Sequence, residues 1–143
     1  MRIKDILTAK PSSEVVTISP DAPVRDLIAL LAEHNIGAVI VSSDGSSVTG
    51  IVSERDVVRR LGTDTGVLDA SVGDIMTVEV QTCAGDDSLT DLMKTMTERR
   101  IRHLPVVADG RLTGIISIGD VVKHRIGELE FERDQLDHYV HQT

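Results

Sequence analysis

The sequence predicts a mixed α/β (α+β) fold made of two copies of one β-α-β-β-α unit, followed by a C-terminal helix. Residues 15–59 recur at 80–123 with the same order of apolar and turn residues. Each copy begins with helically spaced apolar residues and continues with β-branched runs around an Asp-Gly pair. A unit of about 45 residues is too small to bury a sufficient core, so we expect the copies to pack as a pseudo-two-fold pair.

The opening residues of each copy predict a short strand and a helix. Short segments at 15–18 and 80–83, which hold corresponding positions in the two copies, are predicted as the strands. Asp26 and Asp91 lie 65 residues apart and bring the two copies into register. Around them, apolar residues spaced i, i+3, i+4 and i+7 predict one buried helical face in each copy. These residues are Val24, Leu27, Ile28 and Leu31 in the first copy and Leu89, Leu92, Met93 and Met96 in the second.

Two further strands, a tight turn and a second helix complete each copy. The runs before and after the turn are rich in β-branched residues, and Asp-Gly is a strong hairpin signal. In the first copy the strands are 36–41 and 50–53, the turn is Asp44-Gly45 and the helix is 55–61. In the second copy the strands are 101–106 and 114–117, the turn is Asp109-Gly110, and the helix runs from 119 to about 127.

The repeat divides the chain into four predicted segments. They are a first repeat at 1–62, a linker at 63–73, a second repeat at 74–125 and a C-terminal helix and tail at 126–143. In the last segment an approximate heptad seam, interrupted by Arg133, predicts a helix that extends the one before it. This helix packs either on a partner subunit or back on its own domain. The seam residues are Ile126, Leu129, Leu136 and Val140.

Composition predicts a compact soluble domain of the cytoplasm. The chain has 143 residues, is 41% hydrophobic and has no apolar run near the length of a membrane span. Residues 1–5 lack an apolar signal segment, and the single cysteine, Cys83, cannot form an internal disulfide. We interpret Cys83 as a small buried hydrophobe at the position of Ile18 rather than as a reactive thiol.

The charge of the chain argues against nucleic acid as a partner. Lys and Arg number 15 against 23 Asp and Glu, which gives a net charge of −8. This charge opposes the counterion release on which nucleic-acid binding depends. With one Phe, one Tyr and no Trp, the chain also lacks a platform for stacking bases.

Each copy carries the motif Gly-h-h-Ser-x-x-Asp, where h is apolar, at 50–56 and 114–120. The motif takes a strand into a helix N-terminus, where free N–H groups and the macrodipole favour an anion such as phosphate. The serine hydroxyl can donate to phosphate, and the ionised aspartate can accept from both hydroxyls of a ribose. The motif therefore favours a ribonucleotide. The alternative is a capping box that satisfies the first helical N–H groups, and the two roles are compatible.

In element order and motifs the two copies resemble the CBS domain, here as a tandem pair over about residues 1–125. The resemblance rests on the motif in both copies, the strand Leu104-Pro105-Val106-Val107, and the openings Asp5-Ile6-Leu7 and Asp74-Ile75-Met76. It implies two packed CBS repeats that bind adenosine nucleotides in the cleft between them. It also implies a homodimer arranged as a flat disc of four units.

The resemblance further implies which residues contact the nucleotide. Phosphate and ribose contacts are carried over to Ser53, Asp56, Ser117 and Asp120. Adenine pockets are implied at Thr17, Ile18, Ile36, Gly37 and Ala38, and at Thr82, Cys83, Ile101, Arg102 and His103. We expect Arg102 and His103 to reach the phosphates, and Arg55 to supply the charge that Gly37 and Ala38 lack. Whether one or both of these sites bind a nucleotide stays open. Arg99 and Arg100 are interpreted as a solvated helix end.

The predicted function is a regulatory adenosine-nucleotide sensor that signals by population shift. AMP is the first choice of ligand, ADP and ATP follow, and NAD or S-adenosylmethionine are alternatives with the same adenosine half. We expect a homodimer and a protein target that the sequence does not identify. The rival function is a ligand-free interaction scaffold. The sequence shows no catalytic constellation and no metal-ligand spacing, and His138 and His141 are interpreted as a solvated surface. We therefore expect no enzyme and no obligatory cofactor.

Overall fold

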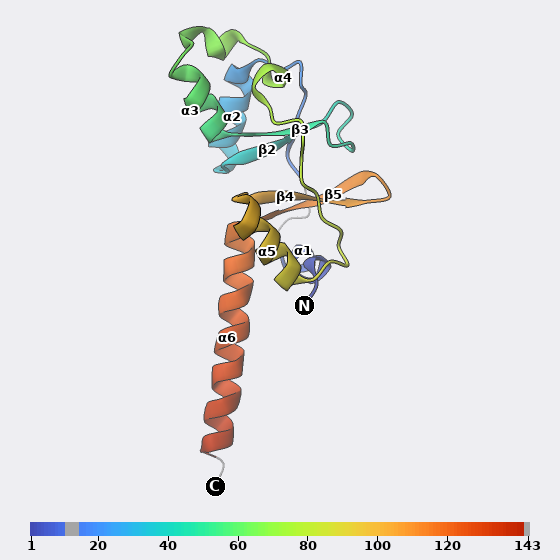
Figure 1. The fold of residues 1–143 in the computed structure, drawn as a ribbon, viewed down its shortest axis with the longest axis vertical. Helices are drawn as coiled ribbons and strands as arrows, with labels where there is room; N and C mark the ends of the chain where they lie inside the picture. The colour runs from blue at the N-terminus through green and yellow to red at the C-terminus, as the bar shows by residue number, and fades with distance from the viewer. Residues whose placement is uncertain (11–14, 142–143) are drawn as a thin grey trace.

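Two small α/β units and one long helix make up the structure, a computed structural model that describes residues 1–10 and 15–141. Figure 1 shows the sheets of the two units facing each other, with helices on their outer sides. The elements are α1 (Ile3–Ala9), β1 (Thr17–Ile18), α2 (Val24–His34), β2 (Ala38–Val41), β3 (Gly50–Ser53), α3 (Glu54–Leu61), the 3-10 helix η1 (Thr65–Asp69), α4 (Val72–Ile75), α5 (Leu89–Arg99), β4 (His103–Ala108), β5 (Arg111–Ser117) and α6 (Ile118–Val140). The predicted α/β fold with two repeats is confirmed.

The first unit is a three-stranded sheet in the order β1-β2-β3, with β1 parallel and β3 antiparallel to β2. All four residues of β2 are buried, as its β-branched sequence predicts. The predicted stripe of α2 packs into this core through Val24, Leu27 and Leu31. Ile28, predicted on the same face, is 37% exposed because it lies at the edge of the stripe.

The second unit has a hairpin of β4 and β5, with an irregularity between Val106 and Val107. The strand predicted at 80–83 is not formed, and only an isolated parallel bridge joins Cys83 to Val106. The backbone N–H of Cys83 donates to the carbonyl of Pro105, and Val107 donates to the carbonyl of Cys83. Pro105 has no N–H with which to extend this pairing toward Gln81, so the strand stops at one bridge.

The short opening helices cross between the two units. Helix α1 buries Ile3 and Ile6 in the second core, beside Leu92 and Leu104. Helix α4 buries Val72 in the first core, which also contains Val67 of η1. Each core is therefore completed by residues outside its own sequence repeat, and the segment 63–73 contributes to the first core. The repeat boundaries at 62 and 74 stay a prediction.

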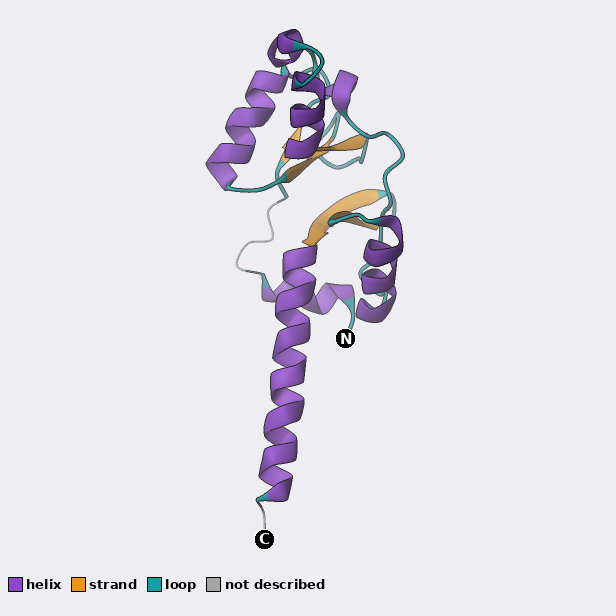
Figure 2. Ribbon diagram, turned by 60° about the vertical axis from the view of Figure 1, so that its left-hand side comes forward, coloured by secondary structure: helices purple, strands orange, loops and turns teal. Residues whose placement is uncertain are grey.

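Helix α6 continues well past the second unit (Figure 2). It runs without interruption over 23 residues, which confirms that the C-terminal helix extends the closing helix of the repeat. Beyond Val121 its apolar side chains are not in either core, and Leu129 and Leu136 are 47% and 65% exposed. Residues 142–143 of the predicted tail lie outside the described residues. No helix in the described part of the chain has the length and apolar character needed to cross a membrane.

Candidate functional site

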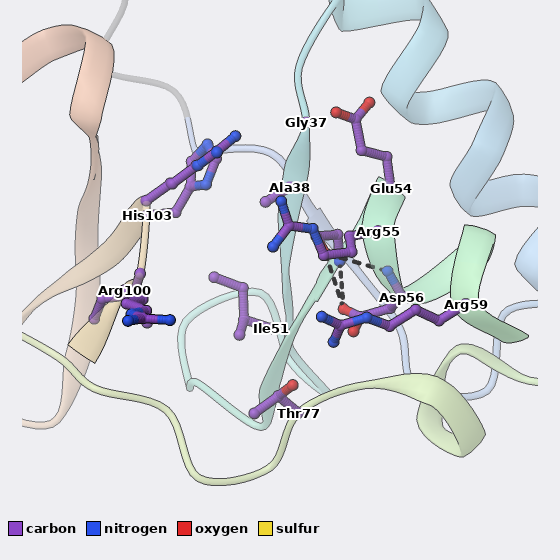
Figure 3. Close-up of a pocket in the computed structure, with 13 residues that line it drawn as sticks. Gly37, Ala38, Ile51, Glu54, Arg55, Asp56, Arg59, Thr77, Arg100 and His103 are labelled. Atoms are coloured by element: carbon purple, nitrogen blue, oxygen red, sulfur yellow. Dashed lines mark hydrogen bonds between the residues drawn. The ribbon is translucent and has the colours of Figure 1, made fainter. Parts of the chain in front are cut away.

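A cavity of about 340 Å³ lies between the two units. The first unit contributes the start of β2, the end of β3 and the first turns of α3, and the second contributes the loop from α5 to β4 (Figure 3). The lining residues are Gly37, Ala38, Ile51, Ser53, Glu54, Arg55, Asp56, Arg59, Thr77, Arg100, Ile101, Arg102 and His103. The cavity therefore joins both sequence repeats at one site.

Eight of the residues predicted to contact a nucleotide line this cavity. They are Gly37, Ala38, Ser53, Arg55, Asp56, Ile101, Arg102 and His103. The other predicted residues do not line it, and they are Thr17, Ile18, Ile36, Thr82, Cys83, Ser117 and Asp120. Ile18 lies in the first core and Ile36 packs against it. The roles of all these residues in binding stay a prediction.

Ser53 and Asp56 form a capping box at the N-terminus of α3. Oδ2 of Asp56 accepts from the backbone N–H of Ser53 at 2.8 Å and from its hydroxyl at 3.1 Å. Both contacts use Oδ2, and Oδ1 of Asp56 has no hydrogen-bond partner among the described residues. The capping alternative is thus present, and it leaves one carboxylate oxygen at the cavity free to accept from a ligand.

Four guanidinium groups surround the cavity, and they come from both units. Arg55 and Arg59 are one helical turn apart on α3, whereas Arg100 and Arg102 come from the α5–β4 loop. None of the four forms an ion pair with a carboxylate among residues 1–10 and 15–141. Against the two carboxylates of Glu54 and Asp56, they give the lining an excess of positive charge in an acidic protein. Such a lining favours an anionic ligand.

Sequence reasoning missed five residues of the lining: Ile51, Glu54, Arg59, Thr77 and Arg100. The i, i+4 spacing of Arg55 and Arg59 on one helix is a signal that would have found Arg59. Arg100, interpreted as part of a solvated helix end, adopts a left-handed conformation with φ 55° at the C-cap of α5 and lines the cavity. Thr77 follows the crossing helix α4, which the repeat alone does not place near β3.

His103 lies on β4 between the cavity and the Asp120 motif. Burial lowers the pKa of His103 below its ordinary value, and Arg102 and Lys10 lower it further, while Asp120 and Glu54 act in the opposite direction. The ring is therefore neutral at pH 7. As a neutral imidazole it offers the cavity one N–H donor and one nitrogen acceptor.

Cys83 lies away from the cavity and is half-buried. Burial raises the pKa of its thiol to about 11, and the nearby charge of Asp87 acts in the same direction. Its Sγ donates to the carbonyl oxygen of Pro105 at 3.6 Å. Because the thiolate is the reactive form, this environment is typical of an inert structural cysteine.

Ser117 and Asp120 form the matching capping box at the start of α6. Here the Nζ of Lys10 lies 3.0 Å from Oδ2 of Asp120 and 3.0 Å from the carbonyl oxygen of Ile115. Burial raises the pKa of Asp120, but the backbone N–H of Ser117 and the Lys10 ammonium outweigh it, so the net pKa is lowered. The two copies of the motif therefore differ in their polar surroundings.

Comparison with known protein families matches the chain to the CBS domain model twice, over residues 3–63 and 72–127. A mitochondrial CBS domain-containing protein of Arabidopsis thaliana is 33% identical over 146 aligned residues, which cover 96% of this chain and 71% of the relative.

Solved structures show the same fold. The crystal structure of a CBS-domain containing protein from Agrobacterium tumefaciens is 42% identical, has a TM-score of 0.83, and matches 87% of this chain and 99% of its own. A CBS domain pair in complex with 5′-methylthioadenosine and S-adenosyl-L-methionine is 24% identical, with a TM-score of 0.79 over 90% of this chain and 98% of its own. At that identity the second likeness concerns the fold alone.

Proposed function

Because this chain belongs to the CBS domain family as a tandem pair, we propose that it binds an adenosine nucleotide between its units and acts as a regulatory sensor. The observation that carries the proposal is the cavity that joins a free oxygen of Asp56 to arginines of both units. A solved CBS pair of the same fold holds adenosyl ligands, which supports the adenosine class.

The lining residues offer separate contacts for the ribose, the adenine and the phosphates of the ligand. Asp56 accepts from the ribose hydroxyls through Oδ1, since Oδ2 is used in the capping box. The apolar side chains of Ala38, Ile51 and Ile101 offer a slot for adenine, whose edge backbone groups can read. The phosphates lie near the guanidinium groups and near the N-terminus of α3. AMP, ADP and ATP each contain these three groups and fit this arrangement of contacts.

The charge of the lining favours nucleotides over S-adenosylmethionine. Arg55, Arg59, Arg100 and Arg102 outnumber the carboxylates of the cavity, and phosphates are the natural partners of guanidinium groups. The sulfonium centre of S-adenosylmethionine is cationic, and the two carboxylates that could balance it, those of Glu54 and Asp56, are outnumbered by the four guanidinium groups. NAD also carries phosphates and remains an alternative. Its nicotinamide nucleotide half would have to fit the same cavity.

Regulation follows from the position of the ligand between two units. A nucleotide that contacts α3 of one unit and the α5–β4 loop of the other stabilises one relative arrangement of the units. The shift of the equilibrium between the two arrangements is limited by the difference in the ligand's affinity for them. We propose binding without chemical conversion of the nucleotide, and the output then passes to a protein target or through a dimer interface. A cytoplasmic location is part of the proposal, supported by the free thiol of Cys83.

Calorimetry with ligand-free protein tests the proposal. AMP, ADP, ATP, NAD, S-adenosylmethionine and GMP are titrated into the wild type and into Asp56→Ala. We expect saturable binding of adenine nucleotides, weaker or absent binding of GMP and S-adenosylmethionine, and at least about a tenfold loss of affinity in Asp56→Ala, because hydrogen bonds to charged groups contribute about 1.5–3 kcal/mol.

Asp74→Ala is the matched control, because it removes the aspartate of another capping box, that of α4, outside the cavity. Its nucleotide affinity is expected to equal that of the wild type. No binding by folded, ligand-free wild type across the whole panel contradicts the proposal and favours the interaction scaffold.

We propose in addition that α6 pairs with α6 of a second copy in a homodimer. The predicted seam continues toward the start of the helix, where Ile118 and Val122 are 46% and 49% exposed. The whole seam is then Ile118, Val122, Ile126, Leu129, Arg133, Leu136 and Val140, at alternating steps of four and three residues after the first. This spacing is that of a coiled-coil stripe, which a second copy of the same helix complements.

Light scattering after size exclusion tests the dimer. The wild type is expected at twice the mass of the chain, and Leu129→Glu is expected to shift it to the monomer, because a charge replaces an apolar residue of the seam. Gln135→Glu introduces the same charge off the seam and is expected to leave the dimer intact. A monomeric wild type, or equal behaviour of both variants, counts against pairing through α6.

A further inference from the structure

The two copies of the Gly-h-h-Ser-x-x-Asp motif differ in what lies beside the aspartate. In the second copy the Lys10 ammonium lies between the Asp120 carboxylate and the Ile115 carbonyl, 3.0 Å from each. Lys10 and Asp120 are 27% and 23% exposed, so this ion pair is partly withdrawn from water. Partial burial makes it less subject to screening than a surface ion pair.

The counterparts of these groups in the first copy have no ammonium beside them. Ile115 and Asp120 correspond to Ile51 and Asp56, each 64 residues earlier, and both of these line the cavity. The Ile51 carbonyl accepts from the backbone N–H of Thr77 at 2.8 Å instead. The Lys10 ammonium contacts Oδ2 of Asp120, the oxygen that also closes the capping box, and thus places a cation beside the second carboxylate that the first carboxylate lacks. A ribose donating to Asp120 would have to displace this ammonium or share the carboxylate with it.

A second side chain, that of His103, also lies beside the motif of the second copy. His103 lies opposite Ser117 in the β4–β5 register, as Ala38 lies opposite Ser53 in the β2–β3 register. The imidazole thus stands beside the second motif where the first motif has a methyl group. Asp120 contributes to the pKa of His103, which agrees with this proximity.

Lys10 is held in place by the crossing of the opening helices. It is the C-cap residue of α1, whose Ile3 and Ile6 are fully buried in the second core. In the repeat the openings Asp5-Ile6-Leu7 and Asp74-Ile75-Met76 correspond, which places Glu79 at the position of Lys10. Glu79 is exposed and has the opposite charge, so this position supplies no cation to Asp56.

We infer that Lys10 is a built-in occupant of the second motif, so that the chain binds one nucleotide, at Asp56, and the Asp120 site is closed. The inference rests on the proposed function and adds the stoichiometry and the residue that sets it. Lys10 is a specificity-determining residue, since its ammonium neutralises the Asp120 carboxylate and stands beside it at 3.0 Å, where a ligand would have to approach.

Calorimetric stoichiometry with AMP and with ATP tests this inference on the full chain. We expect one nucleotide per chain for the wild type, at least about tenfold weaker binding at that one site for Asp56→Ala, and no change for Asp120→Ala. Lys10→Met removes the ammonium but keeps the length of the side chain, and it is expected to bind two nucleotides per chain. The combined variant Lys10→Met with Asp56→Ala is expected to bind one.

Lys4→Met is the matched control, because Lys4 lies on the same helix and its ion pair with Asp86 is exposed. It is expected to bind one nucleotide, as the wild type does. Lys10→Gln serves as the test if Lys10→Met does not fold by circular dichroism. Two nucleotides on the wild type, or one on folded Lys10→Met and Lys10→Gln, overturn the inference and leave the proposed function standing. No binding by the wild type and by both Lys10 variants overturns the proposed function itself.

Discussion

The two carboxylate oxygens of Asp56 differ in use, because one has a structural role and the other is the proposed ligand contact. Oδ2 closes the capping box with Ser53, which aligns the carboxylate and satisfies helical donors at the start of α3. Oδ1 has no hydrogen-bond partner within the described chain, and Asp56 is one of the residues that line the cavity. A residue oriented in this way contacts a ligand with little loss of side-chain entropy on binding.

His103 gives the protein a pH dependence of stability near neutrality. Its pKa lies below the ordinary 6.5 in the folded state because of burial, so the unfolded chain binds more protons below that pH. We expect the free energy of unfolding to fall as the pH drops below about 6.5 and to level off below the folded-state pKa.

Urea denaturation from about pH 8 to about pH 5 measures this dependence. His103→Gln is expected to remove this component, while the other histidines contribute equally to both proteins. A variant that follows the wild type at every pH would refute the assignment to His103.

At the scale of elements, the crossing helices account for the glycine that begins each motif. A Cβ on Gly50 would lie 2.8 Å from the carbonyl oxygen of Thr77, and one on Gly114 would lie 2.8 Å from Cδ2 of Leu7. Both glycines therefore let the segment that crosses from outside the repeat approach the strand. The flexible Leu7 side chain can move aside, whereas the Thr77 backbone is held by hydrogen bonds to Ile51.

Gly50→Ala is expected to lower the free energy of unfolding by about 1–3 kcal/mol, the usual cost of overpacking. Gly127→Ala is the control, because its Cβ meets no atom within 4 Å on α6. It is expected to raise stability by up to about 1 kcal/mol through helix propensity. Chemical denaturation of both variants beside the wild type measures these changes, and equal stability of the two would contradict the proposed close approach.

The elements also show how far sequence reasoning reaches. The repeat register predicted both motifs and the α2 and α5 stripes because these features depend on spacing within one copy. It did not predict Thr77 at the cavity or Lys10 beside Asp120, since each follows an opening helix that packs on the other unit. The failed strand at 80–83 has a local cause in Pro105, and the C-cap conformation of Arg100 depends on its turn. Contacts within a copy were therefore predictable, whereas between the copies the family resemblance indicated Arg102 and His103 but not Thr77 or Lys10.

At the scale of the whole molecule, the exchange of opening helices links the stability of each unit to a distant part of the chain. Ile6 is 1% exposed in the second core, and Val72 is fully buried in the first. Substitutions in one opening helix are therefore felt in the other repeat. The cavity between the units, which both of them line, depends on both exchanges.

Ile6→Ala is expected to destabilise the second unit by about 2–5 kcal/mol, because it leaves a cavity in a closed core. Amide hydrogen exchange of the full chain should show faster exchange in β4 and β5 than in β2 and β3, relative to the wild type. Val72→Ala is the matched variant and is expected to give the opposite pattern. The same set of exchanging amides in both variants would rule out separate effects of the two helices.

The backbone hydrogen bonds that join the start of α1 to the start of α5 have a consequence for biosynthesis. Ile3 donates to the carbonyl of Asp87, and Leu89 donates to the carbonyl of Met1. During translation, α1 is made before its partners in the second core, which extend through Ile116 and Val121. The first core needs nothing beyond α4 and its flanking residues and is complete in the nascent chain much earlier. Helix α1, together with the Lys10 that follows it, must therefore wait until the second repeat has been synthesised before it can dock.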